Sequence, residues 1–122
     1  MINRPTAAQS AGFDAELDAR RLLEEAGLVW IDANVRYKVG ELDLVMRDDA
    51  ALVFVEVRAR ASRSFGGAAA SVDHRKQQRL KRAANCYLLE KYGQRNWPSC
   101  RFDVVAYEAG RPNWIKSAFT VS

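Results

Sequence analysis

Cysteine and histidine are scarce in this sequence, which contains two cysteines, Cys86 and Cys100, and one histidine, His74. Their spacing matches neither a zinc site nor a disulfide framework. No apolar run approaches the roughly 20 residues that span a bilayer, and residues 1–10 lack the apolar stretch of a secretory signal. We therefore expect no membrane partner and a cytoplasmic location, where thiols stay reduced.

Acidic residues are nearly missing from one segment, because eight basic residues and a single acid lie between Arg58 and Arg82. In the rest of the chain acids outnumber bases by fourteen to eleven, so the net charge of +4 belongs to this segment. A localised basic patch predicts a polyanionic partner such as nucleic acid. The plainer interpretation is a helix face that serves only solubility. The predicted nucleic-acid contacts are Arg60, Arg63, Arg75, Lys76, Arg79 and Arg82.

Hydrophobic periodicity predicts an α/β domain. We expect a flexible leader at residues 1–10 and a single domain at 11–122. The expected elements are a helix at 12–26, strands at 28–31 (extending toward 37), 41–47 and 52–59, a loop at 62–71, a helix at 74–92, and strands at 101–107 and 114–121. This order favours a mixed sheet flanked by helices, with the last strand at an edge.

The hairpin formed by the strands at 41–47 and 52–59 carries the most informative charges. A turn centred on residues 49 and 50 places Asp43 directly opposite Glu56, on the same face of the sheet. Two like charges in that position are destabilising and call for compensation. A hard divalent cation, Mg²⁺ or Mn²⁺, would supply it, because such ions bind one or two carboxylates together with water and phosphate oxygens.

Two more acids lie near this pair. The same register sets Glu41 opposite Arg58, and a plain salt bridge between them on a solvated strand face is the rival interpretation. Glu16 lies on the helical face that borders the apolar stripe, so its carboxylate could complete an acidic cluster. An ion pair between Glu16 and Arg20 along the helix is equally consistent with the sequence.

Two blocks of the hairpin resemble a known family. The segments Gly40-Glu41-Leu42-Asp43-Leu44-Val45 and Val53-Phe54-Val55-Glu56-Val57-Arg58-Ala59-Arg60 resemble the YraN-like family of small bacterial proteins. Further matches lie in Phe65-Gly66, in Lys76 with Arg79-Leu80, and in Arg101-Phe102-Asp103-Val104-Val105. That family is similar to the PD-(D/E)xK nuclease superfamily, which includes restriction endonucleases and archaeal Holliday-junction resolvases. The resemblance implies a restriction endonuclease-like core of a helix, three strands, a helix and a strand.

The resemblance also implies roles for the acids. Asp43 and Glu56 would be the metal-binding pair, Glu16 a helix-borne acid that also binds metal, and Glu41 an accessory acid. Arg58 stands where the superfamily has a lysine that orients or deprotonates the attacking water. Because arginine stays charged, Arg58 could bind phosphate but could not accept a proton.

The implied function is a Mg²⁺- or Mn²⁺-dependent endonuclease that hydrolyses phosphodiester bonds in DNA, with branched or flapped DNA suggested by analogy with resolvases. If Arg58 is not a base, either the metal activates water unaided or Lys76 reaches the site. The principal alternative is a nucleic-acid-binding module on the same fold without hydrolysis. A protein-interaction role for Trp97 and Trp114 is a third hypothesis, and a homodimer formed through the last edge strand is compatible with any of them. Asp103 is expected to be structural and paired with a nearby arginine.

Overall fold

A computed structural model of the chain describes residues 14–60 and 71–119. These residues form α2 (Ala15–Glu25), β1 (Val29–Tyr37), β2 (Gly40–Asp48), β3 (Ala51–Arg60), α4 (His74–Tyr92), β4 (Cys100–Glu108) and β5 (Arg111–Phe119). The predicted α/β class and order of elements are confirmed. Several expectations lie outside the described residues, namely the leader at 1–10, the start of the first helix at 12, the loop at 62–70 with Arg63, and the end of the last strand at 121. The side chain of Arg60 is also outside the described part of the structure.

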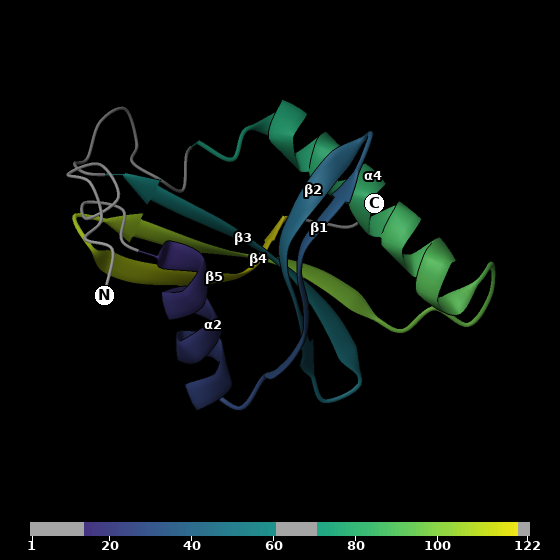
Figure 1. The fold of residues 1–122 in the computed structure, drawn as a ribbon, viewed down its shortest axis with the longest axis horizontal. Coiled ribbons are helices and arrows are strands. Elements are labelled where there is room, and N and C mark those ends of the chain that lie inside the picture. The colour runs from purple at the N-terminus through teal and green to yellow at the C-terminus, as the bar shows by residue number, and fades with distance from the viewer. Residues whose placement is uncertain (1–13, 61–70, 120–122) are drawn as a thin grey trace, which may run out of the picture.

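The strands form one sheet in the order β1-β2-β3-β4-β5 (Figure 1). Neighbouring strands are antiparallel except β3 and β4, which run parallel. A parallel pair needs a crossover connection, and α4 lies within it. The predicted mixed sheet is therefore confirmed. Among the described residues, no helix is long and apolar enough to cross a membrane.

The last strand lies at the sheet edge as predicted, but it begins at Arg111 and not at residue 114. Ala109 and Gly110 both have positive φ, 51° and 79°, and they turn the chain directly after β4. Pairing therefore starts with Glu108 opposite Arg111. Pro112 hides this start in the sequence, because proline is depleted in strands and tolerated mainly at sheet edges.

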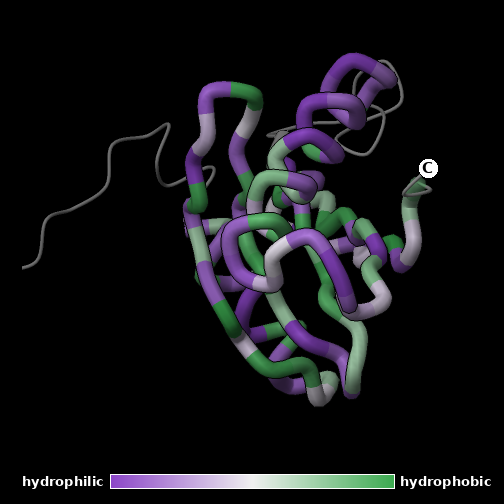
Figure 2. Tube along the Cα trace, turned by 90° about the vertical axis from the view of Figure 1, so that its right-hand side faces the viewer, coloured by the Kyte–Doolittle hydropathy of each residue, from purple (hydrophilic) through white to green (hydrophobic). Residues whose placement is uncertain are grey.

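The two helices cover opposite faces of the sheet. On β3, Phe54 belongs to the core cluster that packs under α4, whereas its neighbours Val53 and Val55 belong to the cluster that packs under α2. Alternation of side chains along a strand explains this division. Figure 2 shows the first turns of α4 as a hydrophilic segment at the top of the molecule, on the same side as the β1–β2 hairpin.

The start of α4 is fixed by its cap, which also sets the position of Lys76. The Asp73 carboxylate accepts a hydrogen bond from the backbone N–H of Lys76 at 2.9 Å, so the predicted N-cap is confirmed. Gly93 closes the helix with φ of 74°, and its N–H donates to the Leu89 carbonyl oxygen at 3.0 Å. The predicted bounds of this helix are therefore confirmed at both ends.

Asp103 of β4 is fully buried and pairs with an arginine, as predicted. Its carboxylate accepts hydrogen bonds from Arg101 Nε at 3.0 Å, Trp114 Nε1 at 2.9 Å and the Ser117 backbone N–H at 3.0 Å. Arg101 also donates through Nη1 to Asp48 Oδ2 at 2.8 Å. This network links β4 to β5 and to the end of β2.

Candidate active site

The β2–β3 hairpin has the predicted register but is irregular at Asp43. The register pairs Asp48 with Ala51 and continues to Leu44 with Val55, the last pair before Asp43. Leu42 and Leu44 would share a face in a regular strand, yet Leu42 packs under α4 and Leu44 under α2. The strand therefore changes face around Asp43.

The Asp43 carboxylate bridges the two strands at this irregular point. Its Oδ2 accepts a hydrogen bond from the backbone N–H of Val57 on β3 at 2.9 Å. This bond fixes Asp43 beside Glu56, the residue that precedes Val57. The two acids that sequence analysis singled out are thus neighbours in the structure.

Glu56 is a buried carboxyl group with incomplete hydrogen bonding. Only 3% of its surface is exposed. Its Oε2 lies 3.4 Å from Lys76 Nζ and 3.5 Å from Arg58 Nη1. Its Oε1 is buried and has no hydrogen-bond partner among the described residues. A buried polar atom without a partner is costly, and in native proteins it often marks a functional position.

Burial and, to a smaller extent, the neighbouring Asp43 carboxylate raise the pKa of Glu56 to about 8, against the opposing effect of Lys76 and Arg58. Two carboxylates this close resist ionising together, so the pair retains a proton near neutral pH. A strongly raised pKa beside a second acid is typical of active sites.

The raised pKa predicts that stability falls as pH rises between about 5 and 8. In this window folded Glu56 keeps its proton, whereas the unfolded chain has lost it, because the ordinary pKa is 4.5. The free energy of unfolding then declines with pH, at up to about 1.4 kcal/mol per unit. Urea denaturation of the wild type at pH 5, 6, 7 and 8 measures this slope, and Glu56→Gln should flatten it. The exposed control Glu25→Gln should keep the wild-type slope, and equal slopes in all three proteins would contradict the assignment.

Lys76 and Arg58 approach the acids from different elements. Lys76 comes from the first turn of α4, and sequence analysis had raised it as a group that reaches the site. Arg58 comes from β3, and its Nε donates to Ser71 Oγ at 2.8 Å. Ser71 was not anticipated as a partner, because it follows a long connection whose path the sequence does not specify. The structure therefore brings one lysine and one arginine to Glu56.

The predicted pairing of Glu41 with Arg58 is wrong. Glu41 lies opposite Arg36 on β1, and their side chains form an ion pair with Oε2 3.6 Å from Arg36 Nε. Arg58 instead forms an ion pair with Glu56 and donates a hydrogen bond to Ser71. The physical reason is the irregularity at Asp43, beyond which the simple register of the hairpin no longer places side chains in facing pairs.

Glu16 is half-buried on α2, and its expected partner Arg20 binds elsewhere. Arg20 pairs with Glu24 at 3.4 Å and lies 4.3 Å from the ring centroid of Trp30, so the alternative of a Glu16–Arg20 pair is wrong. Burial raises the pKa of Glu16, and the Asp43 carboxylate adds to the rise. The carboxyl groups of Glu16 and Asp43 are therefore close enough to interact electrostatically.

The acids do not form a ready-made three-ligand metal site. Within residues 14–60 and 71–119, no three His, Cys, Asp or Glu side chains converge in a way that could hold a metal ion. The arrangement best suits the pair Asp43 and Glu56, and the role of Glu16 as a metal ligand stays a prediction. A hard cation held by two carboxylates, water and substrate oxygens needs no third acid.

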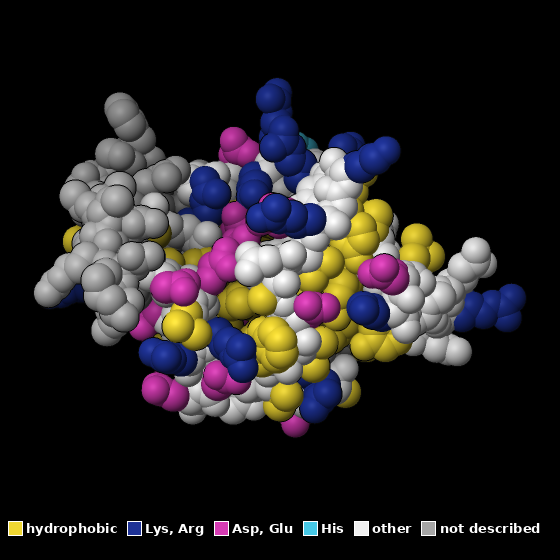
Figure 3. Space-filling view, viewed as in Figure 1, with side chains coloured by type: hydrophobic (Ala, Val, Ile, Leu, Met, Phe, Trp, Pro, Cys, Tyr) yellow, Lys and Arg dark blue, Asp and Glu magenta, His cyan; other side chains and the backbone are white. Residues whose placement is uncertain are grey.

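The basic residues of α4 that were predicted to contact nucleic acid do not all line the same hollow of the surface. Lys76 and Arg79 line a hollow beside the β1–β2 turn, together with Arg36 and Lys38, which sequence analysis did not identify. Figure 3 shows Lys and Arg side chains gathered over this turn and the first half of α4, with Asp and Glu side chains beside them. Arg75 is exposed at the start of the helix.

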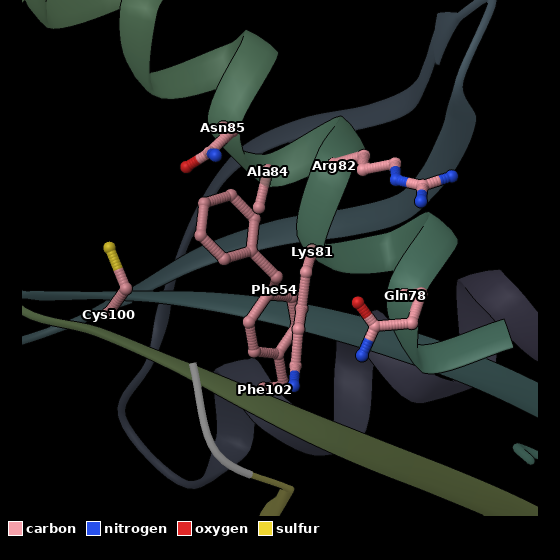
Figure 4. A pocket seen from close by; sticks show the side chains of 8 residues that line it. All are labelled: Phe54, Gln78, Lys81, Arg82, Ala84, Asn85, Cys100 and Phe102. Atoms are coloured by element: carbon pink, nitrogen blue, oxygen red, sulfur yellow. The ribbon is translucent and has the colours of Figure 1, made fainter. Parts of the chain in front are cut away.

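Arg82 lines a separate hollow of about 250 Å³ between α4 and strands β3 and β4 (Figure 4). Phe54 and Phe102 lie at its base. Figure 4 shows Lys81 reaching down beside Phe102, while Arg82 extends away from the aromatic rings. Arg79 and Arg82 thus border different hollows, and the phosphate-binding face formed by Arg75, Arg79 and Arg82 stays a prediction.

The fold and the hairpin site together define a small α/β protein whose five-stranded mixed sheet is flanked by two helices, consistent with a restriction endonuclease-like core. The chain belongs to the family described as "Uncharacterised protein family UPF0102", which it matches over residues 15–107. The predicted family membership is thereby confirmed. The match runs from the start of α2 to Tyr107, one residue before the end of β4, and leaves β5 outside.

Several relatives resemble the chain over nearly its whole length. A UPF0102 protein of Yersinia pseudotuberculosis serotype O:3 is 54% identical over 111 residues, which cover 91% of this chain and 95% of the relative. A UPF0102 protein of Serratia proteamaculans is 51% identical over 111 residues with the same coverage. One from Bordetella petrii is 51% identical over 122 residues, covering 97% of this chain and 75% of the relative.

Proposed function

We propose that this protein is a metal-dependent endonuclease of the PD-(D/E)xK superfamily that hydrolyses phosphodiester bonds in DNA, with branched or flapped DNA as the preferred substrates. The observation that carries the proposal is the buried Glu56 carboxyl group beside Asp43, with an unsatisfied oxygen and a lysine within 3.4 Å. Stability alone gives no reason to place the buried Glu56 carboxyl group beside a second acid, whereas a pair of carboxylates suits a divalent cation that assists hydrolysis.

Asp43 and Glu56 are the residues that would hold Mg²⁺ or Mn²⁺. The unpartnered Glu56 Oε1 fits this role, since a buried carboxylate oxygen without a donor is available to a cation. When bound, such an ion polarises the phosphodiester and lowers the pKa of water. The hydrogen bond from Val57 to Asp43 orients the carboxylate, so that the pair is held in place before substrate arrives.

Lys76 and Arg58 together would perform the roles that a single lysine has in the superfamily motif. Lys76 lies 3.4 Å from Glu56 and can orient the attacking water or take part in proton transfer. Arg58 is held by Ser71 and Glu56, and its permanent charge suits it to binding the phosphate and stabilising the charge that develops there.

The test is cleavage of end-labelled branched, flapped, duplex and single-stranded DNA with Mg²⁺ or Mn²⁺. Wild type is compared with Asp43→Ala and Glu56→Ala, all purified identically so that a contaminating nuclease would appear in each. The exposed control Glu25→Gln should cut like wild type. We expect cutting by wild type and its loss in both site variants. Equal cutting by all proteins, or none by wild type, would overturn the proposal.

A nucleic-acid-binding module without hydrolysis is the second candidate, and Arg58 at the motif lysine position favours it. Such a module has no use for a divalent cation. Calorimetric titration of Mg²⁺ or Mn²⁺ into wild type and Asp43→Ala separates the two, because uptake that depends on Asp43 supports the enzyme. Salt-sensitive DNA binding in all variants without metal uptake supports the module.

The proposal includes a cytoplasmic location and a homodimer formed through β5. Cys86 and Cys100 are free thiols, as expected in a reducing compartment. β5 is the terminal strand of the sheet and offers backbone groups to a second copy across a two-fold axis. A light-scattering mass of one chain would contradict the dimer.

A further inference from the structure

A basic groove lies beside the carboxylate pair, between the β1–β2 turn and the first half of α4. Its volume is about 410 Å³. Four cationic side chains line it, namely Arg36, Lys38, Lys76 and Arg79, and Glu41 is the single acid among its lining residues. Lys76 belongs to both the groove and the carboxylate site, since it also contacts Glu56 at 3.4 Å. An anion in this groove would therefore lie next to the proposed reaction centre.

The groove is built on a direct backbone contact. A Cβ atom added to Gly40 would lie 2.5 Å from the Arg79 carbonyl oxygen, a distance that real Cβ atoms essentially never show. Only glycine lets the β1–β2 turn rest against α4 this closely. The contact fixes the backbone of the turn against the backbone of the helix, so the cationic side chains of both elements extend from positions that need no rearrangement before a ligand binds.

Three of the four cations of the groove, Arg36, Lys38 and Arg79, are available for an anionic ligand. Lys38 and Arg79 form no ion pair within the described part of the chain. Arg36 pairs with Glu41 at 3.6 Å, but the Arg36 side chain is 78% exposed, so this pair contributes little. A phosphate could replace the Glu41 carboxylate at low cost.

We propose that this groove binds the sugar–phosphate backbone of a DNA strand where it enters the carboxylate site, with Arg36, Lys38 and Arg79 contacting its phosphates. The inference rests on the proposed function in taking DNA as the partner, and it adds the β1–β2 turn to the binding surface. Because cations that contact phosphates read no base edges, the groove supplies affinity and strand position without sequence preference.

The test measures DNA binding in EDTA, where no cleavage is needed. Fluorescence anisotropy with labelled branched and duplex DNA is recorded at several salt concentrations between about 50 and 200 mM. The double variant Arg36→Ala/Lys38→Ala is compared with Arg47→Ala/Arg95→Ala, which removes the same charge from exposed positions outside the groove. We expect about tenfold weaker binding in the groove variant and a salt-dependence slope smaller by about 1 to 2, with the control unchanged.

The outcomes separate this inference from the nuclease proposal. If wild type cuts DNA through Asp43 but the groove variant binds like its control, the groove inference is overturned and the nuclease stands. If binding depends on the groove while no protein cuts DNA, the groove stands and the nuclease does not. Absence of salt-sensitive DNA binding in wild type would overturn the groove assignment outright.

Discussion

Lys76→Met is expected to slow DNA cleavage by about 100- to 10,000-fold, the usual contribution of a group that assists proton transfer. Lys76 is the only lysine that contacts Glu56 among the described residues, and it reaches the acid at 3.4 Å. Arg58 cannot replace it as a base, because a guanidinium group does not lose its proton. The measurement is single-turnover cleavage at saturating protein.

Two further variants decide what the lysine does. Lys76→Arg keeps the charge but cannot accept a proton, so it should be as slow as Lys76→Met if proton transfer is the role. If Lys76→Arg keeps most of the activity, the lysine acts through its charge. Arg58→Lys restores the motif lysine and should not slow cleavage. Wild-type rates in Lys76→Met would show that the site works without this amine.

Asp103→Ala is expected to lower the free energy of unfolding by about 3 to 5 kcal/mol, the cost of breaking a buried ion pair from one side. The substitution leaves Arg101 without its buried partner and also leaves the Trp114 indole N–H and the Ser117 backbone N–H without an acceptor. Urea denaturation gives the change, and exposed Glu25→Ala is the control. A loss below about 1 kcal/mol, in the range of surface substitutions, would contradict the assigned role.

A second variant separates the charge from the packing. Replacing both members of the pair with apolar residues, as in Arg101→Met/Asp103→Leu, should recover part of the stability, because the Arg101 charge that has lost the Asp103 carboxylate is then removed as well. If the double variant is no more stable than Asp103→Ala, the loss of stability in Asp103→Ala comes from the hydrogen bonds to Trp114 and Ser117 and not from the Arg101 charge.

The sequence predicted the fold where local signals agree. The α4 helix has both its cap residues in the sequence, Asp73 and Gly93, and its bounds were predicted without error. The hairpin register followed from strand alternation and a short turn, and it is confirmed up to Leu44. The start of β5 was missed, because Pro112 and a turn at Ala109 obscure the strand pattern there.

The site was only partly predictable, because its geometry depends on tertiary packing. The sequence correctly predicted that Asp43 lies beside Glu56 but wrongly paired Glu41 with Arg58. No residue pattern near Asp43 indicates that the strand changes face there. Arg36 and Lys38 carry no motif, and their place in the groove depends on how the β1–β2 turn packs against α4. Gly40 was the available signal, because a glycine before a run of strand residues indicates a close backbone approach.

The Asp103 network also shows that the end of the family match and the end of the packed structure are different positions in the chain. The match to the family description ends at residue 107, yet two of the donors to the buried Asp103 carboxylate, Trp114 and Ser117, lie beyond it. A fragment cut after residue 107 would expose an edge of β4 and leave the buried Asp103 carboxyl group without those two donors. We therefore expect the smallest fragment that folds on its own to extend through β5, past the residues that match the family description.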